Sequence, residues 1–546
     1  MVKSTTIGGY LVTRLEQMGL RHIFGVPGDY VLSFYDQLEA SKLKVIGTCT
    51  EIGAGYAADA YARVNGLGAV CVTYCVGGLN VLNAIAGACA EKSPLIVISG
   101  APGLGERERT PLLHHCVRDF DTQQQIYKHV TVASVELNDP ETAGDLIDDA
   151  IRRCVWEKRP VYIEIPRDMA TRKCPAADGP LRIKKPFSEP EPLAEAVAEA
   201  SNMLRAAKKP VILAGVEMHR FGLQKSLVEL VDRTGFPVAA TMLGKSVISE
   251  RHGRYLGVYE GSVGHEKVRR RVEQADCVLI LGAFMTDINL GIHTARLDTH
   301  RTIYAHSRRV AIKHHHYDDV FLGDFVEALT ASPVGRKHAK LAELSAEPRP
   351  FRPQKNRALS VRRFFARMDH YLQDNTIVVC DVGDCLFAAA DLTIHKSTEF
   401  LCPAYYTSMG FAIPAAIGSQ IRNRRLRPIV FVGDGAFQMT GGELSTIARH
   451  RLNPIIFVLN NKGYTTERFI HEGPYNNIHE WSYHNMPQVM NAGWGCEVRT
   501  EGELEEALGT AQANSKSFSI INVHLDSMDC SAALLRLGER LGKRVK

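Results

Sequence analysis

Short apolar runs of about five residues recur along the chain, and they alternate with segments whose apolar positions have helical spacing. Continuous runs of this length predict strands that are buried on both faces, as in a parallel sheet. The clearest runs are residues 69–73, 94–99, 210–214, 277–281, 428–432 and 454–459. Because strands and helices alternate, the pattern predicts an α/β protein with doubly wound parallel sheets.

Two stretches rich in proline and charged residues interrupt this alternation and predict linkers. The first runs from Pro175 to Pro192, and the second runs from Pro333 to about Arg357. At 546 residues the chain is long enough for three domains, each with its own core. The linkers divide it into residues 1–175, 193–335 and 358–546.

Composition and charge argue against several classes of function. The net charge of +5 is small for this length, and no basic stripe with interleaved aromatic residues suggests a nucleic-acid partner. No apolar run reaches the roughly 18 residues of a membrane span, and the first residues do not resemble a signal peptide. The 13 cysteines are scattered without paired spacing, as in a reduced protein. We therefore expect a cytoplasmic globular protein.

Two motifs in the middle part resemble functional sites but favour other interpretations. Residues 243–246 read Leu-Gly-Lys-Ser, like the end of a phosphate-binding loop, but that motif needs glycine where Ala239 stands. An ordinary turn is expected there. His314, His315 and His316 suggest a metal site, but consecutive histidines cannot all face one side of a strand. Their charged neighbours predict a solvated loop.

The most informative chemical pattern lies at the ends of the last two apolar runs. The first ends in a predicted turn at Gly433-Asp434-Gly435 and the second ends in Asn460-Asn461, with 24 residues between the two motifs. Open α/β sheets bind ligands at such strand ends. Asp434 and Asn461 offer the oxygen ligands that Mg²⁺ requires, and the glycines let backbone N–H groups approach a phosphate. A lone Gly-Asp-Gly is a common turn, but both motifs together predict a metal-diphosphate site.

This pattern resembles the motif of thiamine-diphosphate enzymes, in which Gly-Asp-Gly is followed by some two dozen residues and Asn-Asn. The resemblance covers essentially the whole chain and implies thiamine diphosphate and Mg²⁺ as cofactors. It also implies a helix that begins near Gly441, between the two strands. The implied domains are a pyrimidine-binding domain at 1–175, a middle domain without catalytic residues at 193–335, and a diphosphate- and Mg²⁺-binding domain at 358–546.

The resemblance further implies which residues contact the cofactor and the metal. The expected metal ligands are Asp434, Asn461 and Gly463. The expected cofactor contacts are Glu51, Asp384, Thr407, Met409, Gly433, Asp434, Gly435, Ala436, Asn461, Gly463 and Tyr464.

Glu51 and Met409 carry the most specific of these roles. Glu51 stands where an apolar strand gives way to a helix rich in glycine and alanine, so by itself it would be a glutamate favoured by the helix dipole. Thiamine enzymes need a carboxylate beside N1′ of the aminopyrimidine, so that the 4′-amino group can deprotonate C2, and the resemblance assigns this role to Glu51. Met409 matches the bulky residue that keeps the cofactor bent.

Four further residues resemble the catalytic set of pyruvate and indolepyruvate decarboxylases. They are Asp29 in a Gly/Pro turn, the adjacent His114 and His115, and Glu467, six residues after Asn461. Decarboxylation of a 2-keto acid leaves a carbon that must be protonated, and a hydroxyl must then lose a proton to release aldehyde. Carboxylates and imidazoles that are partly shielded from water can share these transfers. On this resemblance Glu467 contacts the reacting carboxylate, and Asp29 with His115 serves aldehyde release.

The substrate pocket is expected to include Thr466, Ile470 and Tyr406. Pyruvate-specific members carry isoleucine just before the active-site glutamate, whereas this chain has the smaller Thr466. The residues around Asp384 and Gly435 look most like the phenylpyruvate decarboxylase branch. We therefore expect a 2-keto acid larger than pyruvate, with branched, aromatic or medium-length chains.

Two alternatives remain open from sequence, and a third is disfavoured. One is a pyruvate decarboxylase proper, and another is a carboligase of the acetolactate-synthase type, which the His114-His115 pair and Glu467 disfavour. A regulatory subunit without activity would have lost one or more of the catalytic residues. The resemblance also implies a homodimer at minimum, commonly doubled to a homotetramer, with Glu51 and Asp434 of each active site from different chains.

Overall fold

The computed structural model describes residues 4–108, 112–335, 350–395 and 399–545. The chain forms two compact units. The first contains residues 1–185 with 406–425 and 440–452, and the second contains the remainder. No helix among the described residues is long and apolar enough to cross a bilayer.

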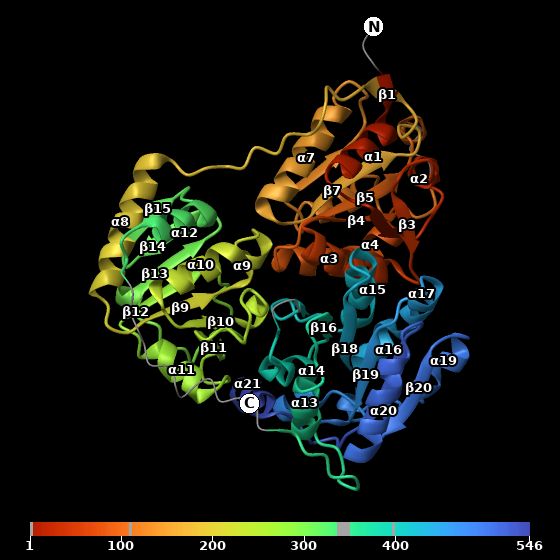
Figure 1. Cartoon of the computed structure of the whole chain (residues 1–546). Helices are drawn as coiled ribbons and strands as arrows, with labels where there is room; N and C mark the ends of the chain where they lie inside the picture. The colour runs from red at the N-terminus through yellow and green to blue at the C-terminus, as the bar shows by residue number, and fades with distance from the viewer. Residues whose placement is uncertain (1–3, 109–111, 336–349, 396–398, 546) are drawn as a thin grey trace. The chain divides into compact units, whose positions relative to one another are not determined.

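The first unit is built on a six-stranded parallel sheet with strand order β3-β2-β4-β5-β7-β6. The order reverses between β2 and β4, which places the crossover helices on both faces, as Figure 1 shows. The strands are β2 (His22–Gly25), β3 (Lys44–Gly47), β4 (Gly68–Val72), β5 (Leu95–Ala101), β6 (Ala133–Glu136) and β7 (Val161–Pro166). The helices are α1 (Ile7–Gln17), α2 (Leu32–Glu39), α3 (Glu51–Asn65), α4 (Val76–Ala90), α5 (Leu104–Arg107), α6 (Thr122–Tyr127) and α7 (Ala143–Glu157).

Two helices from much later in the sequence also belong to the first unit. These are α15 (Ala412–Arg422) and α17 (Leu444–Arg449), the latter preceded by a short 3₁₀ turn at Gly441–Glu443. Helix α15 packs very closely on α3. The approach is so close that a Cβ at Gly418 would lie only 1.9 Å from the carbonyl oxygen of Ala57. The glycine and alanine of this contact are therefore what allows the two backbones to approach.

The second unit contains two sheets, and the one in the middle of the chain is mixed. Its order is β11-β10-β9-β12-β13-β14-β15, in which β14 and β15 are antiparallel additions at one edge. The strands are β9 (Pro210–Ala214), β10 (Val238–Ala240), β11 (Tyr255–Val258), β12 (Cys277–Leu281), β13 (Thr302–His306), β14 (Arg309–Ile312) and β15 (His315–Asp318). The helices are α8 (Pro190–Ala206), α9 (Val216–Arg220), α10 (Gln224–Thr234), α11 (Glu266–Glu273) and α12 (Leu322–Ala331).

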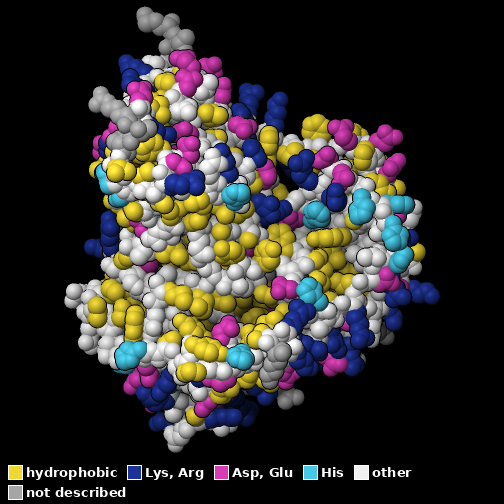
Figure 2. All heavy atoms as spheres, turned by 180° about the vertical axis from the view of Figure 1, so that it is seen from behind, with side chains coloured by type: hydrophobic (Ala, Val, Ile, Leu, Met, Phe, Trp, Pro, Cys, Tyr) yellow, Lys and Arg dark blue, Asp and Glu magenta, His cyan; other side chains and the backbone are white. Residues whose placement is uncertain are grey.

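This part of the structure corrects two expectations. His315 and His316 begin strand β15 rather than lying in a loop, because the chain turns back on β14 at His314. They are exposed, as expected, and Figure 2 shows several histidines at the surface among lysine and arginine side chains. Pro190, expected in the first linker, starts helix α8, where its fixed φ and missing N–H suit the first turn. Most of the second linker lies outside the described residues.

The third sheet is parallel throughout, with order β17-β16-β18-β19-β21-β20. Its strands are β16 (Thr376–Cys380), β17 (Glu399–Leu401), β18 (Arg427–Gly433), β19 (Ile455–Asn460), β20 (Trp494–Val498) and β21 (Ser519–His524). Its helices are α13 (Val361–Asp369), α14 (Asp384–Phe387), α16 (Asp434–Thr440), α18 (Thr465–Ile470), α19 (Met486–Val489), α20 (Glu501–Ala513) and α21 (Ala532–Val545). The strands expected at residues 428–432 and 454–459 are confirmed as β18 and β19, except that β19 begins one residue later, at Ile455.

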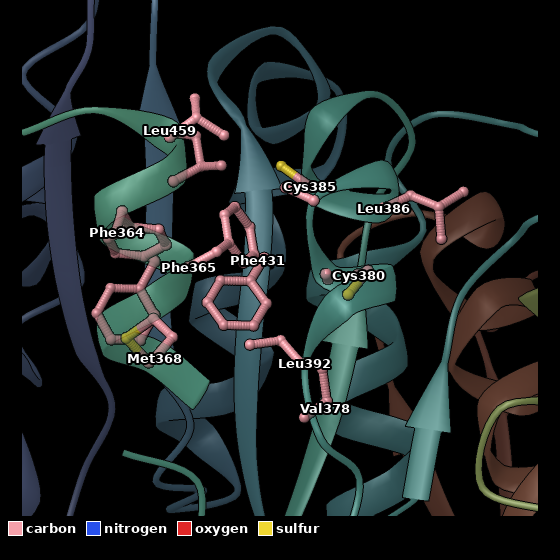
Figure 3. Packing of buried hydrophobic residues seen from close by; sticks show 14 of the residues in the cluster. Phe364, Phe365, Met368, Val378, Cys380, Cys385, Leu386, Leu392, Phe431 and Leu459 are labelled. Carbon is pink, nitrogen blue, oxygen red and sulfur yellow. The ribbon is translucent and has the colours of Figure 1, made fainter. Parts of the chain in front are cut away.

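Aromatic packing between α13 and the third sheet holds β18 in place. Phe364 and Phe365 are buried, and their ring centroids lie 5.9 and 5.1 Å from that of Phe431 on β18 (Figure 3). Phe431 also stacks on Phe457 of β19 at 5.7 Å. Each such side chain contributes roughly 1.5–3 kcal/mol by leaving water, so the two strands are fixed relative to each other by side chains as well as by the ladder.

A buried polar network lies under the first sheet's helices. Gln123 of α6 accepts a hydrogen bond from the N–H of Cys75 at 2.7 Å and donates to Ser99 and to the hydroxyl of Tyr162. That hydroxyl donates in turn to Glu164 of β7, which is 1% exposed. Arg107 Nη2 lies 3.7 Å from Glu164 Oε1, too far for a strong hydrogen bond. Burial therefore raises the pKa of Glu164 to about 7.

We expect Glu164 to make folding pH-dependent. Its pKa rises from 4.5 when unfolded to about 7 when folded, so unfolding releases a proton between these values. The contribution of Glu164 to the free energy of unfolding should therefore be fully present below about pH 4.5. It should be lost as the pH rises through about 7, which amounts to about 3 kcal/mol. Glu164→Gln keeps the shape and should flatten this slope and raise the thermal midpoint at pH 8.

The control is Glu39→Gln, which changes an exposed glutamate at the end of α2 in the same unit. It should follow the wild-type profile. Equal pH slopes for wild type and Glu164→Gln would contradict the assignment.

Candidate active-site residues

The carboxyl ends of β18 and β19 bring the two sequence motifs together. The strands are parallel neighbours in which Gly433 pairs with Leu459, so the residues that follow each strand lie at the same edge. The turn predicted at Gly433-Asp434-Gly435 is not present as a separate turn. Gly433 ends β18 and Asp434 is already the first residue of α16, because a parallel strand can enter its crossover helix directly.

Asp434, Asn461 and Gly463 form a group of oxygen donors at this edge. Asp434 is 1% exposed and accepts hydrogen bonds from the N–H groups of Gly435 at 2.7 Å and Gly463 at 3.2 Å. Burial raises its pKa to about 6. Asn461 Oδ1 is buried, with no hydrogen-bond partner among the described residues. A buried carboxylate beside an unsatisfied amide oxygen suits a hard divalent cation, which would satisfy both.

Two glycines at this edge are required by close contacts. A Cβ at Gly435 would lie 2.4 Å from the ring of Tyr464. Gly463 has φ of +152°, and a Cβ there would lie 2.1 Å from the carbonyl oxygen of Asn476. Around Gly433, by contrast, a Cβ would meet no described atom within 4 Å. The space beside Gly433 is thus open at this strand end, where a ligand such as a phosphate could approach the backbone.

Asp384 lies after the neighbouring strand β16, at the same edge of the sheet. Its Oδ2 accepts the N–H of Ser531 at 2.6 Å, while Oδ1 is buried and has no partner in the described part of the chain. Burial raises its pKa to about 6. The preceding Gly383 has φ of +86°, and a Cβ there would lie 3.3 Å from Thr466 Oγ1. The structure therefore brings the expected pocket residue Thr466 close to the Gly383-Asp384 turn.

Helix α18 carries Thr466, Glu467 and Ile470 close after Asn461. Glu467 is exposed, in the helix's first turn, and Thr466 and Ile470 are half-buried. Arg468 holds this helix: its Nη2 donates to Asn477 Oδ1 at 2.7 Å and to the carbonyl oxygen of Lys462 at 3.1 Å. Sequence reasoning missed Arg468, because an arginine in a helix has no local feature that marks its partners.

In the first unit, Glu51 is the first residue of α3. Thr50 caps the helix by accepting the N–H of Gly53 at 3.1 Å, and the helix dipole favours a carboxylate in this turn. Asn80 of α4 donates from Nδ2 to Glu51 Oε2 at 2.6 Å. Asn80 was not expected from sequence, since it is 29 residues away and on another helix. The carboxylate is thus oriented by a second helix.

Glu443 fixes the turn that leads into Glu51. It is 1% exposed, and its Oε1 accepts the N–H groups of Cys49 and Thr50, each at 3.1 Å. Thr446 donates to the other carboxylate oxygen at 2.7 Å. The sequence predicts a helix that begins near Gly441 but assigns no role to Glu443. No local pattern reveals that it binds a turn nearly 400 residues earlier.

Asp29, His114 and His115 form one cluster in the first unit. His114 Nε2 lies 2.8 Å from Asp29 Oδ2, and the two imidazole rings are 4.7 Å apart. One potential ligand atom from each residue lies within 4.8 Å of those of the others. Arg167 Nη1 lies 3.8 Å from Asp29 Oδ2, so a cation stands beside the cluster. The structure therefore brings Asp29 to a pair of histidines that begins 85 positions later in the sequence.

The loop that carries the two histidines is anchored from beneath. The hydroxyl of Tyr30 donates to the carbonyl oxygen of His114 at 3.1 Å, and that of Tyr74 donates to the carbonyl oxygen of Phe120 at 3.1 Å. Both tyrosines are buried. His115 has φ of +68°, a backbone conformation that a non-glycine residue keeps only when its surroundings impose it. The bond from Tyr30 to the neighbouring His114 contributes to that constraint.

The segment with Tyr406, Thr407 and Met409 also belongs to the first unit. Thr407 has φ of +54° and Gly410 has φ of +89°. The hydroxyl of Tyr406 donates to Asn83 Oδ1 on α4 at 3.1 Å. Tyr406, expected in the substrate pocket, is therefore bonded to a helix of its own unit.

The chain matches the three domain models of one enzyme family. Residues 5–126 match the N-terminal thiamine pyrophosphate binding domain of thiamine pyrophosphate enzymes, and residues 197–331 match their central domain. Residues 381–523 match their C-terminal thiamine pyrophosphate binding domain. These domains imply thiamine diphosphate as the cofactor.

Curated relatives align with the chain over nearly its whole length. Indole-3-pyruvate decarboxylase of Azospirillum brasilense is 36% identical over 538 residues, which cover 96% of each protein. Pyruvate decarboxylase of Aspergillus fumigatus is 33% identical over 559 residues, or 100% of this chain and 98% of the relative. Pyruvate decarboxylase 1 of Pisum sativum is 33% identical over 551 residues, which cover 98% of this chain and 93% of the relative. The chain therefore belongs to the thiamine pyrophosphate enzymes and, within them, to the pyruvate and indolepyruvate decarboxylase family.

Proposed function

We propose that this enzyme removes CO₂ from a 2-keto acid without oxidation and releases an aldehyde, using thiamine diphosphate and Mg²⁺. The observation that carries the proposal is the cluster of Asp29, His114 and His115. A carboxylate hydrogen-bonded to an imidazole, with a second imidazole beside it, can move protons in both directions. The reaction needs both, since a proton must be donated to the carbon that has lost CO₂, and a proton must then be removed from the hydroxyl to release the aldehyde. Full-length similarity to named decarboxylases supports the same activity.

Asp434, Asn461 and Gly463 are the residues we assign to Mg²⁺, with the diphosphate bound at Gly433, Gly435, Ala436 and Tyr464. The support is the buried carboxylate, the unsatisfied Asn461 oxygen and the accessible strand end. When bound, thiamine diphosphate supplies the carbon nucleophile and the electron sink for carboxylate loss. The protein residues bind and orient it, and they move protons.

Glu51 is assigned to hold a proton at the cofactor's pyrimidine nitrogen, which its carboxylate would face. Asn80 supports this role, because its donated hydrogen bond fixes the orientation of the carboxylate. Thr407, Met409 and Asp384 are assigned to the cofactor's bend and surroundings. Glu467 would contact the substrate carboxylate and protonate the product carbon. Their assignments rest on the family resemblance.

Residues 1–175 are proposed as the pyrimidine-binding domain, 193–335 as a domain without catalytic residues, and 358–546 as the diphosphate-binding domain. A homodimer is part of the proposal, commonly doubled to a tetramer, with Glu51 and Asp434 of each site from different chains. This follows from the family resemblance. A cytoplasmic location is also proposed, in line with 13 cysteines that form no disulfide.

We propose that the preferred substrate is larger than pyruvate. Thr466 and Ile470 lie on one side of α18, four residues apart, so together they would shape one wall of the pocket. The space beside Thr466 is limited by the turn at Gly383, and a smaller residue than isoleucine leaves more room there. Pyruvate decarboxylation proper is the alternative.

The purified enzyme with Mg²⁺ and thiamine diphosphate should convert phenylpyruvate, indolepyruvate or a branched 2-keto acid to CO₂ and the aldehyde, with kcat/KM about tenfold above that for pyruvate. Thr466→Ile should shift this ratio toward pyruvate by filling the pocket. Thr299→Ile, an exposed threonine in the middle sheet's domain, is the matched control. Preference for pyruvate would refute the substrate proposal, and an acyloin as sole product would refute decarboxylation to aldehyde.

Glu51→Gln should reduce kcat by about 100-fold or more, because the amide cannot exchange a proton with the cofactor. The fold should be unchanged, since glutamine can still accept the bond from Asn80. Steady-state turnover and the thermal midpoint are measured together, with Glu39→Gln as the control. Near-normal turnover of Glu51→Gln would remove Glu51 from the mechanism.

Exhaustive chelation of divalent cations should release the cofactor and abolish activity, because two buried oxygen donors would lose the ion that links them to the diphosphate. Adding Mg²⁺ with thiamine diphosphate should restore both. Cofactor content is measured in the protein fraction after gel filtration. Full activity and full cofactor content after chelation would exclude the proposed metal site.

A further inference from the structure

One face of helix α4 contacts both Glu51 and the segment from Tyr406 to Met409, which are the first unit's parts of the proposed site. Asn80, Asn83 and Gly87 are spaced three and four residues apart, so they lie on one face of α4. Asn80 binds Glu51, as described above. Asn83 and Gly87 contact the segment from Tyr406 to Met409 instead.

Asn83 is at the centre of a network of side-chain hydrogen bonds. Its Nδ2 donates to Ser408 Oγ at 2.8 Å and to the hydroxyl of Tyr56 at 3.0 Å. Its Oδ1 accepts the hydroxyl of Tyr406 at 3.1 Å. The hydroxyl oxygens of Tyr56 and Ser408 are themselves 2.7 Å apart. Both amide hydrogens and the amide oxygen are engaged, so the orientation of Asn83 is fixed.

Tyr406 is bound at two further points. Its backbone N–H donates to Glu91 Oε1 at 2.9 Å, and Glu91 is buried and paired with Arg63 at 2.8 Å. Its ring lies against Gly87, where a Cβ would be 3.0 Å from the ring. The segment is therefore held by backbone, hydroxyl and ring contacts from α4 and the loop end beyond it.

These contacts surround a residue in an uncommon conformation. Thr407 stands between Tyr406 and Ser408 and has φ of +54°. A β-branched residue in the left-handed region is strained and persists only where neighbouring contacts determine it. The bonds to Tyr406 and Ser408 on its two sides supply that determination. Loss of one of them should relax Thr407 and move Met409, two residues later.

We propose that Asn83, with Tyr56 and Ser408, is a positioning residue that sets the backbone of Thr407 to Met409, and through it the bend of the cofactor. The inference rests on the proposed cofactor contacts of Thr407 and Met409. Asn83 would touch neither cofactor nor substrate. Its effect would be to keep the bulky Met409 side chain within a fraction of an ångström of its place, a displacement to which catalysis is sensitive.

Tyr56→Phe tests this with minimal change, because the ring keeps its edge contact with Phe411 at 5.8 Å and only the hydroxyl is lost. We expect about a three- to tenfold weaker affinity for thiamine diphosphate and about a tenfold lower kcat. Asn83→Ala should have a larger effect of the same kind. The control Tyr304→Phe removes one hydroxyl bond to a carbonyl oxygen in the middle sheet's domain and should change nothing.

Binding of magnesium pyrophosphate to the apoprotein separates positioning from general damage. This probe lacks the pyrimidine and thiazolium rings, so it would use only the anchor at Asp434 and Asn461. The variants should bind it as wild type does while losing affinity for thiamine diphosphate. Equal losses for both probes, or no loss for either, would overturn the proposal. A wild-type protein that binds neither probe would instead overturn the proposed function.

Gly87→Ala provides a second variant that should not weaken folding. Alanine is favoured over glycine within a helix, yet its Cβ would press on the Tyr406 ring at 3.0 Å. We expect an unchanged or higher thermal midpoint together with a several-fold lower kcat and an altered circular-dichroism band of the bound cofactor. An unchanged band and kcat would contradict the role of this segment's placement.

Discussion

Parallel pairing of β18 with β19 is the constraint on which the metal-diphosphate half of the proposed site depends. The register that sets Gly433 beside Leu459 places Asp434 and Asn461 at one edge, and a shift by one residue would turn the side chains of one strand to the opposite face. Phe431 and Phe457 stack between these strands and oppose such a shift. The hydrophobic core therefore fixes the position of polar groups that contribute nothing to it.

Burial without full compensation is the common property of the groups at the strand ends. Asp434 and Asp384 both have pKa values raised to about 6, and each has its burial as the main cause. A folded chain keeps such groups at a cost in stability, since a buried carboxylate loses its hydration. That cost is understandable where a cation or ligand group completes the set of partners. Preorganised donors of this kind need no rearrangement when a ligand arrives.

The first unit achieves its geometry by a different means, with helices that approach closely and polar side chains that bridge them. Small residues on α3 admit α15 at backbone contact distance. Glu443 then reaches the turn before Glu51, and Asn80 reaches Glu51 itself. The proposed catalytic carboxylate and its turn are thereby held by two segments that are remote in sequence. Its precision comes from tertiary contacts, although its helix-terminal position is a local property.

The sequence alone determined the strands, the two motifs at the ends of β18 and β19, and the family, because buried strands and ligand motifs are local patterns of residue type. It predicted a turn at Asp434, where β18 instead leads directly into helix α16. It also predicted a loop at His315, which instead begins the second strand of a β-hairpin. It could not predict the partners Asn80, Asn83 and Glu443. Their bonds join positions from 27 to almost 400 residues apart, and only the packing of α3, α4, α15 and α17 brings those positions within hydrogen-bonding distance.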